Sequence, residues 1–397
     1  MFADTRGHLA TGAREGFAAL ETLVMPPPSR ARGGLLAASP LIVSLFLVFL
    51  VGADYRGAGL VEVDDVARVG SDPCASVRVG EKLPSRASDG ELALVTGGAG
   101  FIGSTLTELL LSLGFRVRVL DNLSTGDRSY VPEGAEFVEG DVRDYETVES
   151  AVSGGVAVVF HLAAMSKVEP SLGDPKMIRF CLDNNVLGTD NVLRASLTAK
   201  VSKVVYAASS TYYGNQPTPF AETLEYKVSS PYAQTKREGE MLAKLYDELH
   251  GLPTVSLRLF MVYGERQPTE GAYSIVTGTF LRQAAAGEPL TIEGDGSHYR
   301  DFVHVADVAR AMVLAYQNPD ARGMEVNVGS GDAVRVGEVA DMISKEQVHV
   351  PRRENDLVGT LADTCKAKKL LGFETTRVFR DEMRRRAREA KEAAAGR

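Results

Sequence analysis

The sequence predicts an α/β fold in which helices cover both faces of a parallel sheet. Three observations carry this prediction. From residue 91 onward, short apolar segments alternate with segments whose apolar residues recur at helical spacing. A glycine-rich turn joins the first apolar segment to the first helix, and an aspartate ends the second apolar segment. Together these features predict a doubly wound parallel sheet of the Rossmann type.

The first expected strand, residues 91–96, is followed by Gly97, Gly100 and Gly103. In such a turn the first glycine permits the tight bend, and the second lets the backbone approach a pyrophosphate. The third lets the helix pack closely on the strand. Free N–H groups at the start of the helix can then bind phosphate. Because the turn lies between a strand and a helix, we interpret it as a dinucleotide site rather than an ordinary glycine-rich turn.

Asp121 ends the second expected strand and selects between two dinucleotides. A carboxylate at this point accepts hydrogen bonds from a ribose 2′-hydroxyl and repels a 2′-phosphate, which favours NAD over NADP. Arg128 lies seven residues later and points the other way, but we interpret it as a solvated loop charge. We therefore expect NAD.

The next segments continue the alternation of strand and helix, and residues 91–260 are expected to form the NAD-binding domain. These segments are residues 135–144, 145–152, 156–164, 177–197 and 203–210. Asp141 and Val142 close one strand at the sheet edge that binds ligands, where a carboxylate can accept from an adenine amino group. Helix capping by Asp141 or Asp144 is the alternative. His161 ends an apolar strand and is expected to be structural.

The amino-terminal part differs from the rest of the chain. Residues 1–34 are rich in Ala, Gly, Arg and Pro and are expected to be disordered, and residues 54–90 are expected to be a linker. Residues 35–53 are uncharged and apolar, close to the roughly 20 residues that cross a bilayer as a helix. We expect a membrane anchor or a cleaved signal, and the Golgi or endoplasmic reticulum lumen rather than the cytoplasm. An apolar stretch in an unstructured extension is the alternative.

The composition excludes some classes of protein. The 397 residues are 44% hydrophobic and 24% charged, with a formal net charge of -8, which is globular and argues against a nucleic-acid partner. The three cysteines, Cys74, Cys181 and Cys365, are widely spaced and form neither a disulfide framework nor a Cys-x-x-Cys metal site. We therefore expect buried or idle thiols and no metal.

Several short segments occur in an order that is typical of one enzyme family. They are TGGAGFIGS, GDVRD, FHLAA, NNVLGT, SSTYYG, SPYAQTK, GDGSHYRDFVHVADV and NVGSG. With these segments, residues 91 to about 375 resemble the extended short-chain dehydrogenases/reductases, and most closely the nucleotide-sugar epimerases of the UDP-glucose 4-epimerase group. The resemblance implies an NAD-dependent enzyme that inverts C4 of a UDP-hexose.

The resemblance also implies roles for individual residues. It assigns catalysis to Ser209, Tyr232 and Lys236. It places these residues around NAD: Gly97, Gly100, Phe101, Ile102, Gly103, Asp121, Asn122, Asp141, Val142, Leu162, Ala163, Ala164, Asn185, Tyr232, Lys236 and Phe260. For Asn185, a structural role at the turn of its helix is the alternative.

For the nucleotide sugar, the resemblance implies a second set of residues. They are Ser209, Tyr232, Arg300, Arg353, Asp356 and Thr360. A small residue at position 360 leaves room for a 2-acetamido group, so the substrates expected are UDP-glucose and UDP-galactose and also their N-acetyl forms. Met261 stands where the family has an asparagine that contacts substrate, and methionine cannot donate that hydrogen bond.

The spacing of Tyr232 and Lys236 agrees with an acid/base pair. Four residues apart, they share one helical face. A free phenol has a pKa near 10, and bringing it to about 7 requires roughly 4 kcal/mol. A nearby ammonium and the positive nicotinamide can supply this, while Ser209 aligns the substrate oxygen.

The residues beside Ser209 point to the type of reaction. Relatives that eliminate water or remove a carboxylate have acids where this chain has Ser210 and Thr211. Without an acid there, what remains for a 4-keto intermediate is return of the hydride to the opposite face of C4, which is epimerisation. The alternatives are a UDP-glucuronate 4-epimerase, another NAD-dependent nucleotide-sugar reductase or dehydratase, and a non-enzymatic NAD sensor, which would not need the triad.

Beyond residue 260, the resemblance implies a smaller C-terminal α/β substrate domain. Residues 261–378 are expected to bind the nucleotide sugar and to return segments to the main sheet. Residues 379–397 are expected to form a charged, solvated helical tail. The resemblance also implies a homodimer formed by two helices of the NAD-binding half, including the helix that carries Tyr232.

Overall fold

The computed structural model describes residues 90–166, 168–270, 274–352 and 357–395. The expected disordered terminus, the apolar segment 35–53 and residues 54–89 of the expected linker lie outside the described residues, and so do Arg353 and Asp356. Within the described ranges, no helix is both long and apolar enough to cross a membrane. That finding does not bear on residues 35–53.

The central element is a seven-stranded sheet in which every neighbouring pair of strands is parallel. Its strands are β1 (Leu92–Thr96), β2 (Arg116–Asp121), β3 (Ala135–Glu139), β4 (Val156–His161), β5 (Lys203–Ser209), β6 (Thr254–Leu259) and β10 (Met324–Val328). They lie in the order β10-β6-β5-β4-β1-β2-β3. The order reverses between β1 and β4, where the carboxyl ends of parallel strands border a crevice. The predicted doubly wound fold is confirmed.

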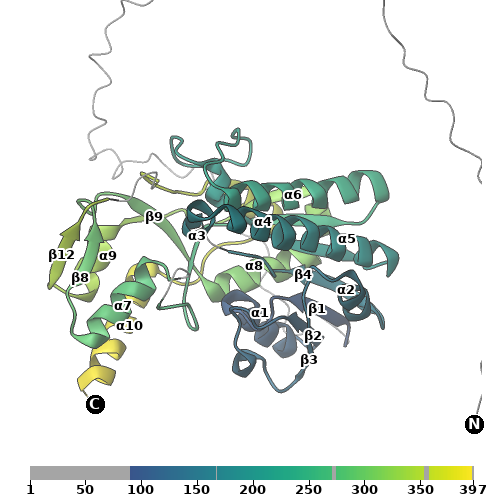
Figure 1. The fold of residues 1–397 in the computed structure, drawn as a ribbon, viewed down its shortest axis with the longest axis horizontal. Coiled ribbons are helices and arrows are strands. Elements are labelled where there is room, and N and C mark those ends of the chain that lie inside the picture. The colour runs from purple at the N-terminus through teal and green to yellow at the C-terminus, as the bar shows by residue number, and fades with distance from the viewer. Residues whose placement is uncertain (1–89, 167, 271–273, 353–356, 396–397) are drawn as a thin grey trace, which may run out of the picture. The chain divides into compact units, whose positions relative to one another are not determined.

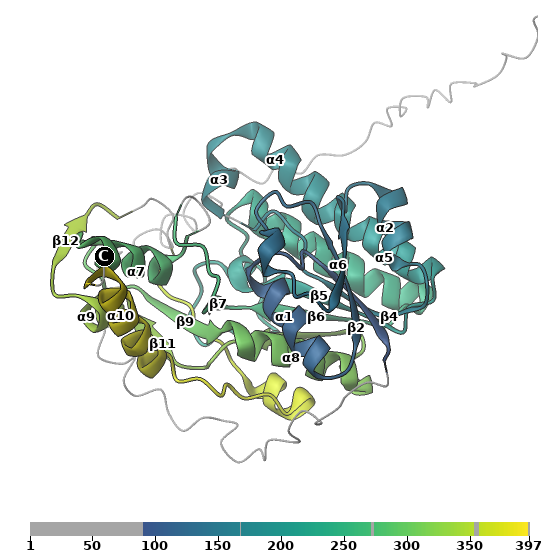
Figure 2. The ribbon, with the colours of Figure 1, turned by 90° about the horizontal axis from the view of Figure 1, so that it is seen from below.

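Helices cover both faces of this sheet because alternate side chains of each strand point in opposite directions. In β1, Ala93 and Val95 pack with α1 (Phe101–Ser112) and α8 (Val305–Gln317). Figure 2 shows these two helices next to each other. Leu92 and Leu94 pack on the other face in a cluster with residues of α2, α5 and α6. These three helices are α2 (Tyr145–Val152), α5 (Gly188–Thr198) and α6 (Pro231–His250).

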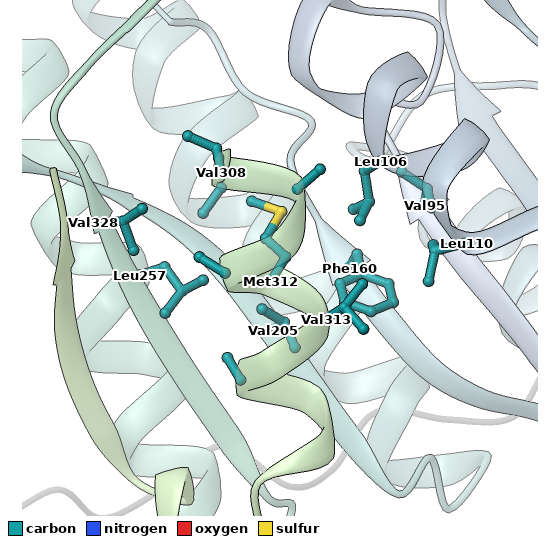
Figure 3. Packing of buried hydrophobic residues seen from close by; sticks show 14 of the residues in the cluster. Val95, Leu106, Leu110, Phe160, Val205, Leu257, Val308, Met312, Val313 and Val328 are labelled. Carbon is teal, nitrogen blue, oxygen red and sulfur yellow. The ribbon is translucent and has the colours of Figure 1, made fainter. Parts of the chain in front are cut away.

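Figure 3 shows the first of these two interfaces, in which Val308, Met312 and Val313 of α8 pack among side chains of the strands and of α1. Two shorter helices, α3 (Val168–Gly173) and α4 (Pro175–Leu182), precede α5. A single π-helical turn, Asp183–Leu187, joins α4 to α5.

The remaining elements form a smaller α/β unit (Figure 1). One sheet has the order β11-β9-β7, and a second consists of β12 and β8. The strands are β7 (Met261–Tyr263), β8 (Leu290–Glu293), β9 (Tyr299–His304), β11 (Ala333–Arg335) and β12 (Gln347–Val350). The helices are α7 (Val276–Ala286), α9 (Val336–Ile343) and α10 (Phe379–Ala395). Between these elements the chain returns to the main sheet to supply α8 and β10.

The charged tail is not fully solvated, so that expectation is wrong. In α10, Phe379, Met383 and Ala387 are buried in the core of the smaller unit. The ring of Phe379 stacks on that of Phe302 with centroids 4.2 Å apart. These three residues are spaced by four, so they form one apolar stripe on an otherwise charged helix. The high charge of the tail concealed this stripe in the sequence.

The cysteines also depart in part from expectation. Cys181 is a buried free thiol, as expected. Cys365 takes part in a disulfide bond, so the expectation of an idle thiol is wrong at this position.

Candidate active site

A cavity of about 840 Å³ lies where the carboxyl ends of the central strands meet the smaller unit. Most residues predicted for the site line it. They are Gly97, Gly100, Phe101, Ile102, Gly103, Asp121, Asn122, Val142, Leu162, Ala163, Ala164, Ser209, Tyr232, Lys236, Phe260, Arg300 and Thr360. Asp141 and Asn185 are not among the lining residues.

The glycine turn has room for nothing larger than hydrogen. Gly97 has a φ of +71°, and a Cβ on it would lie 2.7 Å from the backbone nitrogen of Ala163. A Cβ on Gly103 would lie 2.1 Å from the carbonyl oxygen of Gly97. Within the described residues, no side chain caps the start of α1 at Gly100. The first N–H groups of α1 therefore remain for an anion, which fits a dinucleotide pyrophosphate.

Asp121 is held in place by the backbone of the same turn. Its two carboxylate oxygens accept from Ala99 N at 3.0 Å and from Leu123 N at 2.8 Å. Burial raises the pKa of Asp121, and these two hydrogen bonds oppose the rise. Each carboxylate oxygen can accept a further hydrogen bond, so the residue fits a ribose hydroxyl.

Asp141 has other partners. Arg143 pairs with its carboxylate at 2.7 Å, and Asn122 Nδ2 donates to it at 2.8 Å. These hydrogen bonds, chiefly those from Arg143, lower the pKa of Asp141 to about 2. Asp144 is the residue that caps α2, by accepting from Glu146 N. In this geometry Asp141 holds Asn122, which does line the cavity, rather than facing the cavity itself.

Ser209, Tyr232 and Lys236 come together from two elements. Ser209 is the last residue of β5, and its Oγ lies 2.9 Å from Thr211 Oγ1. Tyr232 and Lys236 lie in the first two turns of α6, which is capped by the hydroxyl of Ser230 accepting from Ala233 N at 3.1 Å. The local sequence explains this helix start, because Ser at the cap and Pro at the first helical position favour it.

Burial dominates the electrostatics of Tyr232 and Lys236 in the nucleotide-free protein. Burial raises the pKa of Tyr232, and a hydrogen bond with Ser209 only partly opposes this. The expected acidic phenol is therefore not produced by the protein side chains alone. Burial also lowers the pKa of Lys236 to about 7, with Glu240 opposing the change. The Lys236 ammonium lies 4.3 Å from the centroid of the Tyr206 ring.

Two buried polar residues have structural partners. Asn185 accepts from Met165 N at 2.8 Å and donates to Met165 O and Thr235 Oγ1, each at 3.0 Å. It thus ties the segment after β4 to α6, which favours the structural alternative. His161 is held between Thr96 Oγ1 at 2.7 Å and Thr189 Oγ1 at 3.0 Å, and burial lowers its pKa to about 3. The prediction of a structural histidine is confirmed.

The smaller unit lines the other end of the cavity with Met261, Arg300 and Thr360. Arg300 donates to Tyr299 O at 2.9 Å, and Thr360 Oγ1 accepts from Asp301 N at 3.3 Å. Tyr299 packs so closely on Gly359 that a Cβ there would lie 2.1 Å from its ring. This contact fixes the backbone at Thr360.

The sequence reasoning missed several lining residues, including Gln267, Glu270, Glu293 and His298. Two of these residues, Glu270 and Glu293, bring carboxylates to the cavity. Both belong to the smaller unit, whereas the neighbours of Ser209 are not acidic. No short pattern marks these residues, since loops and strand ends of the smaller unit bring them to the cavity. Among the described residues, no group of three or more His, Cys, Asp or Glu could hold a metal ion.

The fold and the cavity define a dinucleotide-binding protein of the Rossmann class, in which Ser209, Tyr232 and Lys236 line the same cavity as the glycine turn. More particularly, the chain belongs to the NAD dependent epimerase/dehydratase family, whose model matches residues 93–329.

Three known proteins show how similar the relatives are. A putative UDP-glucose 4-epimerase of Methanocaldococcus jannaschii is 35% identical over 287 residues, which are 70% of this chain and 92% of that protein. The crystal structure of a Thermotoga maritima UDP-glucose 4-epimerase with UDP-glucose has a TM-score of 0.71 and 31% identity, covering 76% of this chain and 99% of the other. The crystal structure of a Thermus thermophilus UDP-glucose 4-epimerase with NAD has a TM-score of 0.70 and 34% identity. It covers 76% of this chain and 99% of the other.

Lys236→Met should stabilise the nucleotide-free protein at neutral pH. Burial lowers the pKa of Lys236 from its usual 10.5 to about 7, so the folded state binds fewer protons than the unfolded state between these pH values. The cost of the buried charge is full below pH 7 and disappears as the pH approaches the unfolded pKa. The gain should be on the order of 4 kcal/mol at pH 6 and should decline toward pH 10, as measured by unfolding at each pH.

Lys244→Met is the matched control, because Lys244 lies on the same helix, is half-exposed and pairs with Glu325 at 3.1 Å. It should give no stabilisation at any of these pH values. A gain that does not vary with pH for Lys236→Met would contradict a buried lysine of lowered pKa.

Proposed function

We propose that this protein is an NAD-dependent 4-epimerase that interconverts UDP-glucose and UDP-galactose through a transient 4-keto sugar. One observation carries the proposal. Ser209, Tyr232 and Lys236 line the same cavity as the glycine turn and Asp121, and the residues beside Ser209 are Ser210 and Thr211 rather than acids. The relatives described above, named as UDP-glucose 4-epimerases, support it.

NAD, when bound, supplies a hydride acceptor and donor at its nicotinamide ring. The residues proposed to hold it are the glycine turn, Asp121 and Asn122, together with the backbone of Leu162 to Ala164 and Phe260. The fit rests on the space left at Gly97 and Gly103 and on the uncapped first turn of α1. Lys236 is proposed to lie beside the nicotinamide ribose, where its buried amine can donate hydrogen bonds.

Tyr232 is proposed to take the proton of the sugar 4-hydroxyl while the C4 hydride leaves, and to give a proton back to the same oxygen when hydride is added to the opposite face of C4. Ser209 holds the same oxygen and hydrogen-bonds the phenol. Because burial raises the pKa of the free phenol, the charge that lowers it must come mainly from Lys236 and from positive charge brought in with NAD. Binding of the dinucleotide and activation of Tyr232 are then coupled.

The substrate end of the cavity is proposed to bind the UDP moiety. Arg300 suits phosphate oxygens, and Arg353 and Asp356 are proposed to add to this set from the sequence pattern. Met261 offers only an apolar surface where a donor was expected, so its part of the sugar is bound by packing. The small Thr360 leaves space that supports acceptance of the 2-acetamido sugars.

Tyr232→Phe should abolish exchange between the C4 epimers, because the general acid/base is lost while the ring is kept. We expect a fall of about 10²- to 10⁴-fold in the rate of UDP-galactose formation from UDP-glucose, followed by NMR. Tyr246→Phe is the control, since Tyr246 lies on the same helix and donates to Asp190 at 2.7 Å, away from the lining residues. Equal activity in the two variants would exclude Tyr232 as the acid/base.

The same NMR assay with UDP-N-acetylglucosamine and UDP-N-acetylgalactosamine tests the room at Thr360. Conversion of both sugar pairs is expected, with no net change in NADH. Strict exclusion of the acetamido sugars would remove that part of the proposal. A stable keto product from any sugar would instead indicate a dehydratase or reductase.

We also propose a homodimer formed through α6 and the α4–α5 segment. Large apolar side chains are exposed there: Leu182, Leu187, Met241, Leu245 and Leu249. Such a patch on neighbouring helices is typical of a two-fold helix-pair interface. Leu245→Asp should halve the mass measured by light scattering, whereas Leu172→Asp, at an equally exposed leucine of α3, should leave it unchanged. A wild-type monomer would contradict this proposal.

Finally, we propose that residues 35–53 direct the chain to the secretory pathway, as an anchor or a cleaved signal. Support comes from the uncharged apolar composition of this segment. Fractionation of cells that express the full chain tests it, because recovery of intact chain in the cytosolic fraction contradicts it.

A further inference from the structure

A buried ion pair lies one helical turn from Lys236 and is not used by the mechanism above. Glu240 of α6 and Arg258 of β6 have side chains that are only 4% and 1% exposed. Arg258 donates to both carboxylate oxygens of Glu240, through Nε at 3.0 Å and through NH2 at 2.7 Å. Removing two charges from water is costly, and apolar residues often fill such a site equally well. Stability therefore does not explain why an ion pair rather than apolar residues lies here, and we looked for a role in function.

The pair is connected directly to the segment that carries Ser209. A 3₁₀ turn, Ser210–Tyr213, follows Ser209, and two of its tyrosines reach the pair. The hydroxyl of Tyr212 donates to Glu240. That of Tyr213 accepts from Arg258 at 2.7 Å and donates to Asn327 of β10 at 2.8 Å. Thus α6, the turn after β5, β6 and β10 all meet at one buried network.

Resting on the proposed function, we propose that Glu240, held by Arg258 and Tyr212, is a positioning residue for the catalytic site. It fixes the turn after Ser209 against the helix that carries Tyr232 and Lys236, and it keeps the Lys236 amine charged. The first effect follows from shared hydrogen bonds, and the second follows from the charge of Glu240 one turn away on the same helix.

The titratable side chains around the Lys236 amine are neutral, apart from Glu240. The Tyr206 ring of β5 lies 4.3 Å from the Lys236 amine, and burial raises the pKa of Tyr206, so this phenol is neutral. His161 of β4 is neutral because burial lowers its pKa to about 3. Tyr232, on α6, is neutral in the resting protein because burial raises its pKa. Glu240 supplies the negative charge that opposes the effect of burial on Lys236, while Arg258 anchors Glu240 from the other side.

Two tyrosines of the network provide a matched comparison. Tyr212 donates to one carboxylate oxygen of Glu240. Tyr226 donates to the other at 3.3 Å and accepts from Arg258 at 2.8 Å. Both therefore contact the same ion pair, but only Tyr212 belongs to the turn that begins after Ser209. Tyr→Phe at each position removes one hydroxyl and keeps the ring.

The test measures kcat and KM for C4 exchange in Tyr212→Phe, Tyr226→Phe and wild type, with unfolding of each variant measured in parallel. Tyr212→Phe should lower kcat about tenfold with KM for the nucleotide sugar changed less than about twofold, while Tyr226→Phe should keep both near wild type. Equal effects of the two variants, or an effect confined to KM, would overturn the positioning role. A wild-type enzyme without C4 exchange would overturn the proposed function and this role with it.

The charge effect is tested with Glu240→Gln, which keeps the shape of the side chain. Without Glu240 the pKa of Lys236 falls, so the limb of the kcat–pH profile that reports loss of its proton should move to lower pH. Asp247→Asn is the control, because Asp247 lies on the same helix and pairs with Arg322 at 2.8 Å, far from Lys236 along the helix. Identical profiles for Glu240→Gln and wild type would overturn the charge effect. If Glu240→Gln fails to fold, the two tyrosine variants decide the proposal.

Discussion

The parallel pairing of the strands is the constraint on which the rest of the structure depends. In a parallel sheet all carboxyl ends lie at one edge, so residues that follow different strands become neighbours. The glycine turn follows β1, Asp121 ends β2 and Ser209 ends β5. Leu162 to Ala164 follow β4, and Phe260 follows β6. One hydrogen-bonding pattern thus brings together much of one end of the cavity, from the segments between Gly97 and Phe260.

The cavity lining passes from the main sheet to the smaller unit within the backbone at the end of β6. Phe260 lines the cavity beside the main sheet, and Met261 begins β7 of the smaller unit. The chain later returns through α8 and β10, which pack on and pair with the main sheet. The chain therefore passes between the two units more than once, although each unit has its own sheets and its own buried cluster.

Burial of polar groups is the second theme of the site. Tyr232 and Lys236 are both buried, which raises the pKa of the phenol and lowers that of the amine. Each shift disfavours the charged form, and a nearby opposite charge, such as that of Glu240 beside Lys236, opposes it. The Glu240–Arg258 pair is also buried but is charged, because its two charges are joined by two hydrogen bonds. Burying ionisable groups in this way costs free energy of folding. It also gathers groups with shifted pKa values at the site, which is typical of functional sites.

The sequence by itself determined the fold class, the glycine turn and the acid at Asp121, because these depend on local spacing and strand–helix alternation. Ser209, Tyr232 and Lys236 were assigned from the family resemblance of the motifs that contain them. Tertiary structure alone decided where side chains with several possible partners point. Asp141 turned to Arg143, Asn185 to Met165 and Thr235, and Arg258 of β6 met Glu240 of α6. It also decided that Phe379 and Met383 bury one face of a charged helix. The physical reason is that hydrogen bonds, burial and pKa depend on neighbours brought together by long-range packing, which no local pattern records.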